Sequence, residues 1–239
     1  MCCNKYSKYD KKFVFFIDIL GFKNLVETSN NPIEIKQKID LLKDDFKEQN
    51  KKHSLDYEIT QVSDCIIISF SINDKFKLYP MLLIISYVQA NAFIKHRLLF
   101  RGAGTYGDII HDKDYLFGKG YQKALNFESN FAEFPRIIID KESFQDLKSQ
   151  DEKASCLDLL KEDGDFYYID FINNELYCDD SLNDKINFLN QCGKIIKENL
   201  QHEKNILKKY NWLKKNYNIS ITEFNNINKT KLKKNLRKL

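Results

Sequence analysis

The stretch KFVFFIDILGFKN, residues 12–24, constrains the fold most, because it is typical of a strand buried on both faces. Residues 13–19 are all apolar except for one carboxylate, Asp18. A buried carboxylate without a partner costs free energy or takes up a proton, so Asp18 requires a cap, a cation or a metal ion. The remainder of the chain has to supply that partner.

The composition allows one large domain, or one domain with a helical appendage, because 43% of the 239 residues are hydrophobic. The 38 basic residues nearly balance the 34 acidic ones, so the net charge of +4 does not call for nucleic acid. The six cysteines show no zinc-ligand spacing and no signal peptide precedes them, so we expect reduced thiols in a cytoplasmic protein. The most apolar segment, 78–94, is interrupted by Pro, Gln and Asn and is too short for a membrane span.

Hydrophobic periodicity and turn residues predict the order of the helices and strands. The first part contains a strand at 13–19, a helix at 30–50, strands at 57–63 and 65–70, a helix at 78–96, and a strand with a hairpin at 98–120. The second part contains a short helix at 120–131, strands at 135–140 and 165–171, and a mostly helical segment from Leu182. The hairpin region holds five of the eight glycines, which indicates close backbone approach.

The first six elements follow the split βαβ order of a ferredoxin-like fold. We therefore expect an α+β protein with a βαββαβ core, extra strands and a C-terminal helical segment. The predicted organisation is a flexible N-terminal arm at 1–12, the α+β domain at 13–180 and a helical extension at 181–239. The extension ends in a basic tail at 228–239, which we expect to be solvated; contact with nucleic acid or a membrane surface is the alternative.

This topology brings two aspartates together. The third strand lies between the first two and antiparallel to both, so the end of strand one and the turn at Ser63 and Asp64 share one sheet edge. Asp18 and Asp64 then lie on strands about 4.8 Å apart. Taken singly, Asp18 is compatible with a turn cap and Asp64 with an ordinary hairpin turn. Together they repel unless a cation lies between them, and oxygen ligands suit magnesium or manganese.

The residues after Asp18 fit a phosphate group. Gly21 allows a tight turn in which free backbone amides face an anion such as a triphosphate. Two metal ions held by carboxylates can activate a hydroxyl and neutralise a leaving pyrophosphate. Metal-dependent phosphate chemistry is therefore the leading hypothesis.

Three segments carry a resemblance to a known family. FFIDILGF, QVSDCIIISF and the block from FRGAG to RIIID resemble class III nucleotidyl cyclases, and look most like the pyrimidine nucleotide cyclases of the Pycsar antiphage systems. The likeness extends over about 13–140, and 208–218 is similar to the C-terminal helix of those proteins.

The resemblance implies a homodimer with active sites between its subunits. Such an enzyme converts a nucleoside triphosphate to a 3',5'-cyclic monophosphate and pyrophosphate with two Mn²⁺ or Mg²⁺ ions per site. It implies UTP as substrate and cUMP as product, with CTP and cCMP as the alternative. A separate effector would sense the cyclic nucleotide in phage defence, and no stable nucleic-acid or membrane partner is expected.

The motif match also implies roles for individual residues. Asp18 and Asp64 would bind the metals together with the carbonyl of Ile19, while the amides around Gly21 and Phe22 would hold the triphosphate. For the base, Thr60 falls where purine-using relatives carry a selecting lysine, and its hydroxyl fits a pyrimidine edge without choosing one. Tyr57 is a further candidate for base contact, with a partly buried strand aromatic as the alternative.

The chain departs from the wider class on the helix predicted at 120–131. Gln122 stands where an Asn usually orients the ribose, and Asn126 stands where an Arg usually stabilises the transition state. Arg101 is the candidate replacement for that charge, with an arginine paired to a surface acid as the alternative. Further candidates are Lys119, Lys123 and Arg136.

Two other functions compete with cyclisation. The missing helix arginine is also compatible with a cyclase-like module that binds nucleotide without turnover. Another palm-type phosphoryl-transfer enzyme is the third hypothesis, although no GGDEF-like sequence favours it. The four histidines show no pairing with a nucleophile, so we expect no catalytic role for His53, His96, His111 or His202.

Overall fold

The computed structural model describes residues 8–53, 56–72, 78–145, 155–173, 181–201, 204–232 and 235–239. Cys65, Cys156 and Cys192 are free thiols. Cys2, Cys3, Cys178 and His202, together with most of the predicted N-terminal arm, lie outside the described residues. Within the described segments, no helix combines the length and the apolar character needed to cross a membrane.

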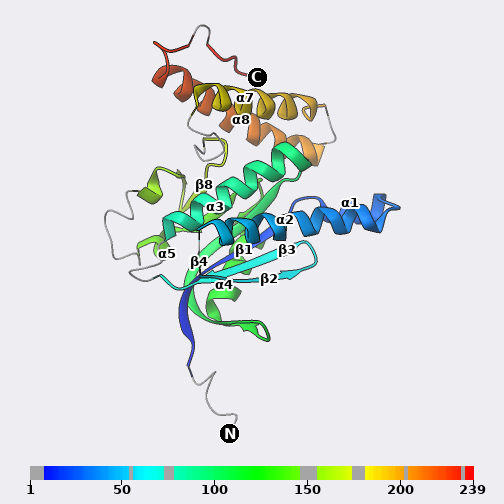
Figure 1. Cartoon of the computed structure of the whole chain (residues 1–239), viewed down its shortest axis with the longest axis vertical. Coiled ribbons are helices and arrows are strands. Elements are labelled where there is room, and N and C mark those ends of the chain that lie inside the picture. Colours follow the sequence, from blue (N-terminus) through cyan, green and yellow to red (C-terminus); the bar gives the residue numbers. More distant parts are fainter. Residues whose placement is uncertain are drawn as a thin grey trace.

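All the described strands and most of the described helices come first along the chain, and two consecutive helices follow the last strand (Figure 1). The first group is β1 (Asp10–Ile19), α1 (Phe22–Thr28), α2 (Pro32–His53), β2 (Glu58–Val62), β3 (Cys65–Phe70), α3 (Leu78–Asn91) and the π-helical turn η1 (Ala92–His96). The second group is β4 (Phe100–His111), β5 (Leu116–Phe117), α4 (Lys119–Phe131), β6 (Ile137–Asp140) and α5 (Lys141–Gln145). The last group is β7 (Leu160–Asp163), β8 (Phe166–Ile169), α7 (Leu182–Glu198) and α8 (Lys204–Ile227).

The strands form one sheet in the order β2-β3-β1-β4-β6-β8-β7, with β5 paired to β4. β3 lies between β2 and β1 and runs antiparallel to both. The predicted α+β class and βαββαβ core are therefore confirmed.

Helices cover both faces of the sheet, which explains why β1 is almost continuously apolar. Phe13, Phe15 and Ile17 pack into the core under α2 and α3. Val14 and Phe16 point to the opposite face and pack with Ala124 of α4. Because side chains alternate along a strand, Asp18 falls on the face that α4 covers.

The glycine-rich segment makes the close approach that the sequence predicts. A Cβ atom built on Gly107 of β4 would lie 3.0 Å from the Cα atom of Gly120 in α4. Thr105 donates its hydroxyl to the carbonyl of Gly120 at 2.9 Å. α4 can therefore lie directly on β4, beside the end of β1.

Some elements differ from the prediction. β1 begins at Asp10, inside the predicted arm at 1–12, because its pairing with β4 continues to that residue. α1 and β7 were not predicted, since elements of seven and four residues are too short to show a clear hydrophobic period. The helix predicted at 78–96 ends in the π-helical turn η1.

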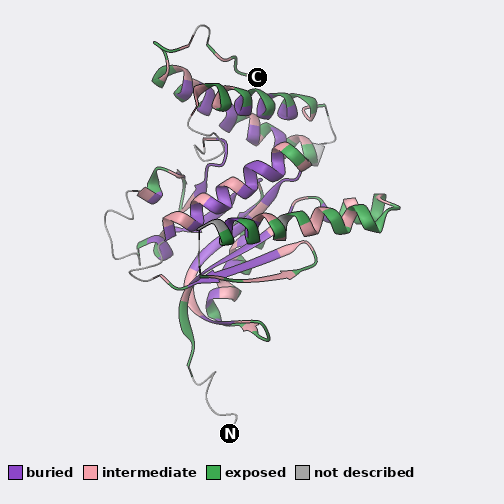
Figure 2. Cartoon of the chain, viewed as in Figure 1, coloured by how far each residue is buried: buried purple, intermediate pink, exposed green. Residues whose placement is uncertain are grey.

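The last two helices, α7 and α8, form a layer at one end of the molecule, far from the start of β1 (Figure 1). Buried residues of α7 and α8 make up a core of their own together with residues around η1, as the purple ribbon in Figure 2 shows. The expectation of a solvated tail is wrong for 235–239. The amides of Leu236 and Leu239 donate to the side chains of Asn225 and Asn218, and both leucines pack against the helical core.

Candidate functional site

Asp18 and Asp64 converge at the sheet edge that the topology predicts. Asp18, near the end of β1, is paired with Cys65, the first residue of β3. Asp64 occupies the tight turn before it, where Ser63 adopts a left-handed conformation with φ of 55°. One ligand atom from each of Asp18, Asp64 and Cys65 lies within 4.8 Å of the other two. The predicted convergence is confirmed.

Arg101 joins this pair from the other neighbour of β1. It lies opposite Asp18 in the β1–β4 register, and its Nε donates to Asp18 Oδ2 at 2.9 Å. The same nitrogen lies 2.8 Å from Oε1 of Glu128, which is buried on α4. The alternative of an arginine paired with a surface acid is therefore wrong, because both partner carboxylates are largely shielded from solvent.

The electrostatics of the cluster favour an added cation. Burial raises the pKa of Asp18 to about 6; Arg101 opposes this rise, and Asp64 adds to it. The pKa of Lys209 on α8 is lowered by its burial and by Arg101, and Asp18 opposes this shift. Asp18 thus lies near the carboxylate of Asp64, the guanidinium of Arg101 and, at longer range, the half-buried Lys209. A cation bound between Asp18 and Asp64 would offset the repulsion that helps to raise the pKa of Asp18.

The donor set fits a hard metal ion better than a soft one. Burial, with the charges of Asp18 and Asp64, raises the pKa of the Cys65 thiol to about 12. The Cys65 Sγ–H group donates to Asp18 Oδ1 at a sulfur–oxygen distance of 3.7 Å, and its proton therefore remains on sulfur at neutral pH. The two carboxylates are oxygen ligands of the kind that Mg²⁺ and Mn²⁺ prefer.

The turn after β1 has the backbone that an anion site needs. Gly21 is left-handed, with φ of 84°, and serves as the N-cap of α1 without a side-chain hydrogen bond. Its carbonyl accepts the amide of Leu25, while the side chain of Phe22 is buried in the core. The first amides of α1 therefore follow Asp18 directly, and the glycine conformation that the sequence predicts is present.

The two residues predicted to contact the base lie on opposite faces of the sheet. Thr60 is in register with Ile67 and, through β3, with Phe16, so it shares the α4 face with Asp18. Tyr57 packs on the other face, where its hydroxyl donates to the carbonyl of Phe46 at 2.5 Å. The prediction that Tyr57 belongs to the site is therefore wrong, because its ring is part of the core under α2.

The predicted α4 residues stay apart from the carboxylate pair within one chain. Gln122, Asn126 and Lys119 are exposed on α4, and Asn126 accepts a hydrogen bond from Asn130. Lys123, also on α4, pairs instead with acidic groups next to β6.

The structure assigns Arg136 to the core instead of the site. Its guanidinium pairs with Asp163 and lies between the rings of Phe134, Tyr168 and Trp212. Arg136 therefore joins β6 to α8, and its proposed role as a reserve phosphate ligand is wrong.

Sequence reasoning missed Glu128 and Lys209. Glu128 falls at the helical spacing of Gly120 and Ala124, so an acid on the buried face of α4 was the available signal. Lys209 had no such signal, because its approach to the site depends on how α8 packs.

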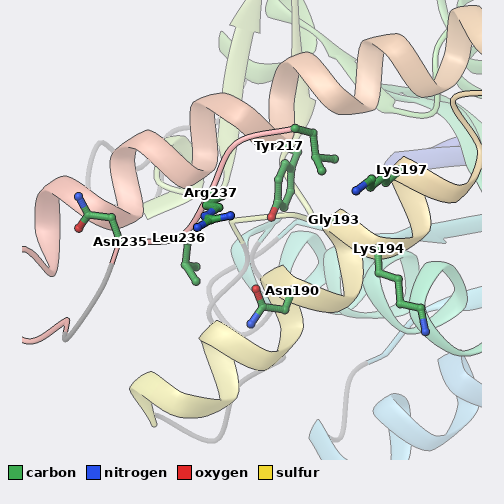
Figure 3. Close-up of a pocket in the computed structure, with 9 residues that line it drawn as sticks. Asn190, Gly193, Lys194, Lys197, Tyr217, Asn235, Leu236 and Arg237 are labelled. Atoms are coloured by element: carbon green, nitrogen blue, oxygen red, sulfur yellow. The ribbon is translucent and has the colours of Figure 1, made fainter.

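A separate hollow of about 450 Å³ lies between α7, α8 and the tail (Figure 3). Lys194, Lys197 and Arg237 line it, and the ring of Tyr217 points from α8 toward Gly193 of α7. No predicted site residue borders this hollow. We therefore place the chemistry at the carboxylate cluster.

Comparison with solved structures identifies the fold. The catalytic core of a rhodopsin-guanylyl cyclase with converted specificity, in complex with ATPαS, is 16% identical, with a TM-score of 0.51 over 69% of this chain and 97% of that one. The monomeric guanylyl cyclase domain of the RhoGC fusion protein from the aquatic fungus Blastocladiella emersonii is 14% identical, with a TM-score of 0.50 over 68% and 96%. The sequence matches no protein-family model and no curated protein. This chain therefore has the fold of nucleotide cyclase catalytic domains.

Proposed function

We propose that this chain is a nucleotide cyclase that converts UTP to 3',5'-cyclic UMP and pyrophosphate. The convergence of Asp18, Asp64 and Arg101 at one sheet edge of a cyclase fold carries the proposal. In the reaction the 3'-oxygen bonds to the α-phosphorus, and the bond to the leaving pyrophosphate breaks. The resemblance of the motifs to pyrimidine cyclases supports UTP over purine nucleotides, with CTP as the alternative.

Different residues of the chain would bind the metal ions and the phosphates at this site. Asp18, Asp64 and the carbonyl of Ile19 would hold two Mn²⁺ or Mg²⁺ ions. When bound, these ions supply charge neutralisation on the phosphates and a lower pKa for the attacking hydroxyl. The amides after Gly21 would bind the phosphates, and Arg101 would provide positive charge beside them.

We propose that the active unit is a homodimer. Gln122 and Asn126 are exposed on α4, whereas Glu128 on the buried face of that helix lies beside Arg101. The two exposed residues would therefore contact a nucleotide bound across a subunit boundary. Leu125 and Phe131 are exposed on the same helix, and Phe117 is exposed on the adjacent β5. Exposed apolar side chains next to the candidate ribose residue Gln122 and to Asn126 are what an interface containing an active site requires.

The wider biological proposal rests on the resemblance. The catalytic unit would comprise 13–180, and 181–239 would be a helical extension. The protein would act in the cytoplasm, and cUMP would serve as the signal for a separate effector in antiphage defence.

Incubation of the purified protein with each of the four ribonucleotides and Mn²⁺ tests the activity. Chromatography of the products should show cUMP and pyrophosphate from UTP, while the Asp64→Asn variant should form neither. The Asp114→Asn variant, which changes an exposed hairpin residue, is the matched control and should keep full activity. The proposal fails if no cyclic product appears with any of the four.

A nucleotide-binding module without turnover is the second candidate function. The observation that favours it is the absence of arginine from α4, where Asn126 occupies the position of the usual transition-state residue. This function predicts that UTP binds in the presence of Mn²⁺ and is recovered unchanged. Binding with turnover excludes it.

A further inference from the structure

A chain of three polar side chains runs beneath the α4 face of the sheet. His111, at the end of β4, is buried, and its Nε2 lies 2.9 Å from Oγ1 of the half-buried Thr60. Its Nδ1 lies 2.8 Å from Oγ of Ser69, a fully buried residue of β3. Thr60 is thus the only one of the three that is partly open to solvent.

The imidazole of His111, in the middle of this hydrogen-bonded series, is neutral. Burial lowers the pKa of His111 to about 4; the charge of Lys12 lowers it further, and Asp112 opposes the shift. A neutral imidazole has one N–H donor and one acceptor nitrogen. One hydroxyl must therefore donate to the ring and the other must accept from it.

Ser69, the buried end of the series, determines which groups donate and which accept in its hydrogen bonds. Among the described residues, Ser69 Oγ has one hydrogen-bond partner, which is Nδ1 of His111. If Nδ1 carried the proton, the hydroxyl hydrogen of Ser69 would be buried without an acceptor, which is unfavourable. Ser69 therefore donates to Nδ1, and the Nε2–H group donates to Thr60. The hydroxyl hydrogen of Thr60 is then left to point outward.

We propose that Ser69 and His111 hold Thr60 as a hydrogen-bond donor that selects a base with a carbonyl group over a base with an amino group. This inference rests on the proposed function and deepens it. A free threonine hydroxyl has one hydrogen to donate and two lone pairs that accept, so Thr60 alone would not choose between pyrimidines. The Nε2–H group of His111 occupies one lone pair and leaves the hydrogen free, which favours donation to the base. Uracil has a carbonyl oxygen at position 4, where cytosine has an amino group. Ser69 and His111 are positioning residues, and Thr60 is the contact.

The ratio of kcat/KM for UTP to that for CTP measures the effect. We expect the wild type to favour UTP by at least about tenfold, the effect of one hydrogen bond. Ser69→Ala should reduce this ratio about tenfold, because Ser69 no longer fixes the direction of the hydrogen bonds through His111. Thr60→Val removes the hydroxyl itself and should reduce the ratio equally. Thr60→Ser keeps the hydroxyl and should keep the ratio. Ser86→Ala removes a buried hydroxyl of α3 that has no hydrogen-bond partner in the described part of the chain, so it is the matched control.

The outcomes separate this inference from the proposed function. A wild type that favours CTP, or a folded Ser69→Ala variant with an unchanged ratio, overturns the inference while cyclisation stands. If no nucleotide is cyclised, the proposed function fails, and the dissociation constants of UTP and CTP with Mn²⁺ test the inference instead. Tighter binding of UTP that is lost in Ser69→Ala supports it. Equal or absent binding overturns it.

Discussion

Replacing Asp18 with Asn should stabilise the metal-free protein while abolishing catalysis. The pKa of Asp18 rises from 3.8 to about 6 because burial and Asp64 outweigh Arg101. This difference corresponds to about 3 kcal/mol at a pH where the carboxylate is fully charged. Because an amide also loses part of the ion pair with Arg101, we expect a net gain of about 1 to 3 kcal/mol for Asp18→Asn at pH 7.5.

The sign follows from proton binding. The folded state holds the Asp18 proton more tightly than the unfolded state, so this group lowers the unfolding free energy as pH rises from about 4 to about 6. The advantage of Asp18→Asn over the wild type should therefore be largest above pH 6 and vanish near pH 4. Groups common to both proteins, including His111, cancel in this difference.

Urea denaturation in EDTA at several pH values between 4 and 7.5 measures the unfolding free energy. In a parallel thermal denaturation, each kcal/mol should appear as about 2–4 °C in Tm for a chain of this size. Added Mn²⁺ should stabilise the wild type and leave Asp18→Asn unchanged. A loss of stability at pH 7.5, or a difference between the two proteins that does not change with pH, would refute the reasoning.

Three other substitutions or truncations test the remaining contacts. Arg101→Lys should lower kcat roughly hundredfold, because an ammonium lacks the planar fork, and a kcat within threefold of wild type would contradict its role. Trp212→Ala should cost about 2 to 4 kcal/mol in urea denaturation, because this ring stacks on Phe134, and an unchanged midpoint would exclude that contribution. In the wild type, the fluorescence of this single tryptophan should be more accessible to an added quencher when α8 is detached from Phe134 than when it is docked. Removal of 235–239 should lower Tm by a few degrees, since two leucines lose packing; an unchanged Tm would show that the docked tail adds nothing.

The sequence was sufficient for the sheet and for the aspartate pair. The apolar run at 13–19 predicts a central strand, and the order of the next elements determines which strand lies beside it. Because paired strands keep a regular register, the position of Asp64 next to Cys65, the partner of Asp18 at the end of β1, follows from this order. Arg101 was placed by its motif, and the register with Asp18 agrees with that choice.

The residues that the sequence could not place depend on packing between distant elements. Tyr57, just before β2, and Thr60, within it, are three residues apart and lie on opposite faces, and only the register decides which one accompanies Asp18. Arg136 is basic and close to the predicted site in sequence, but the aromatic rings around it come from three separate elements. Lys209 approaches the site only because α8 packs beside it.

The position of Arg101 explains how a cyclase could function without an arginine on α4. In this structure its Nε–H donates to Asp18, while Glu128 Oε1, which has no hydrogen-bond partner among the described residues, lies within ion-pair distance of the same nitrogen. No hydrogen bond from the remaining N–H groups of Arg101 to a described residue is present. With Asp18 as a metal ligand, as proposed above, Arg101 would keep Glu128 as its acidic partner. Glu128, fixed in the interior of α4, would then retain Arg101 beside the phosphates with its outer donors free. The buried glutamate on the helix would thus replace the missing helix arginine indirectly, by holding an arginine of the neighbouring strand in the site.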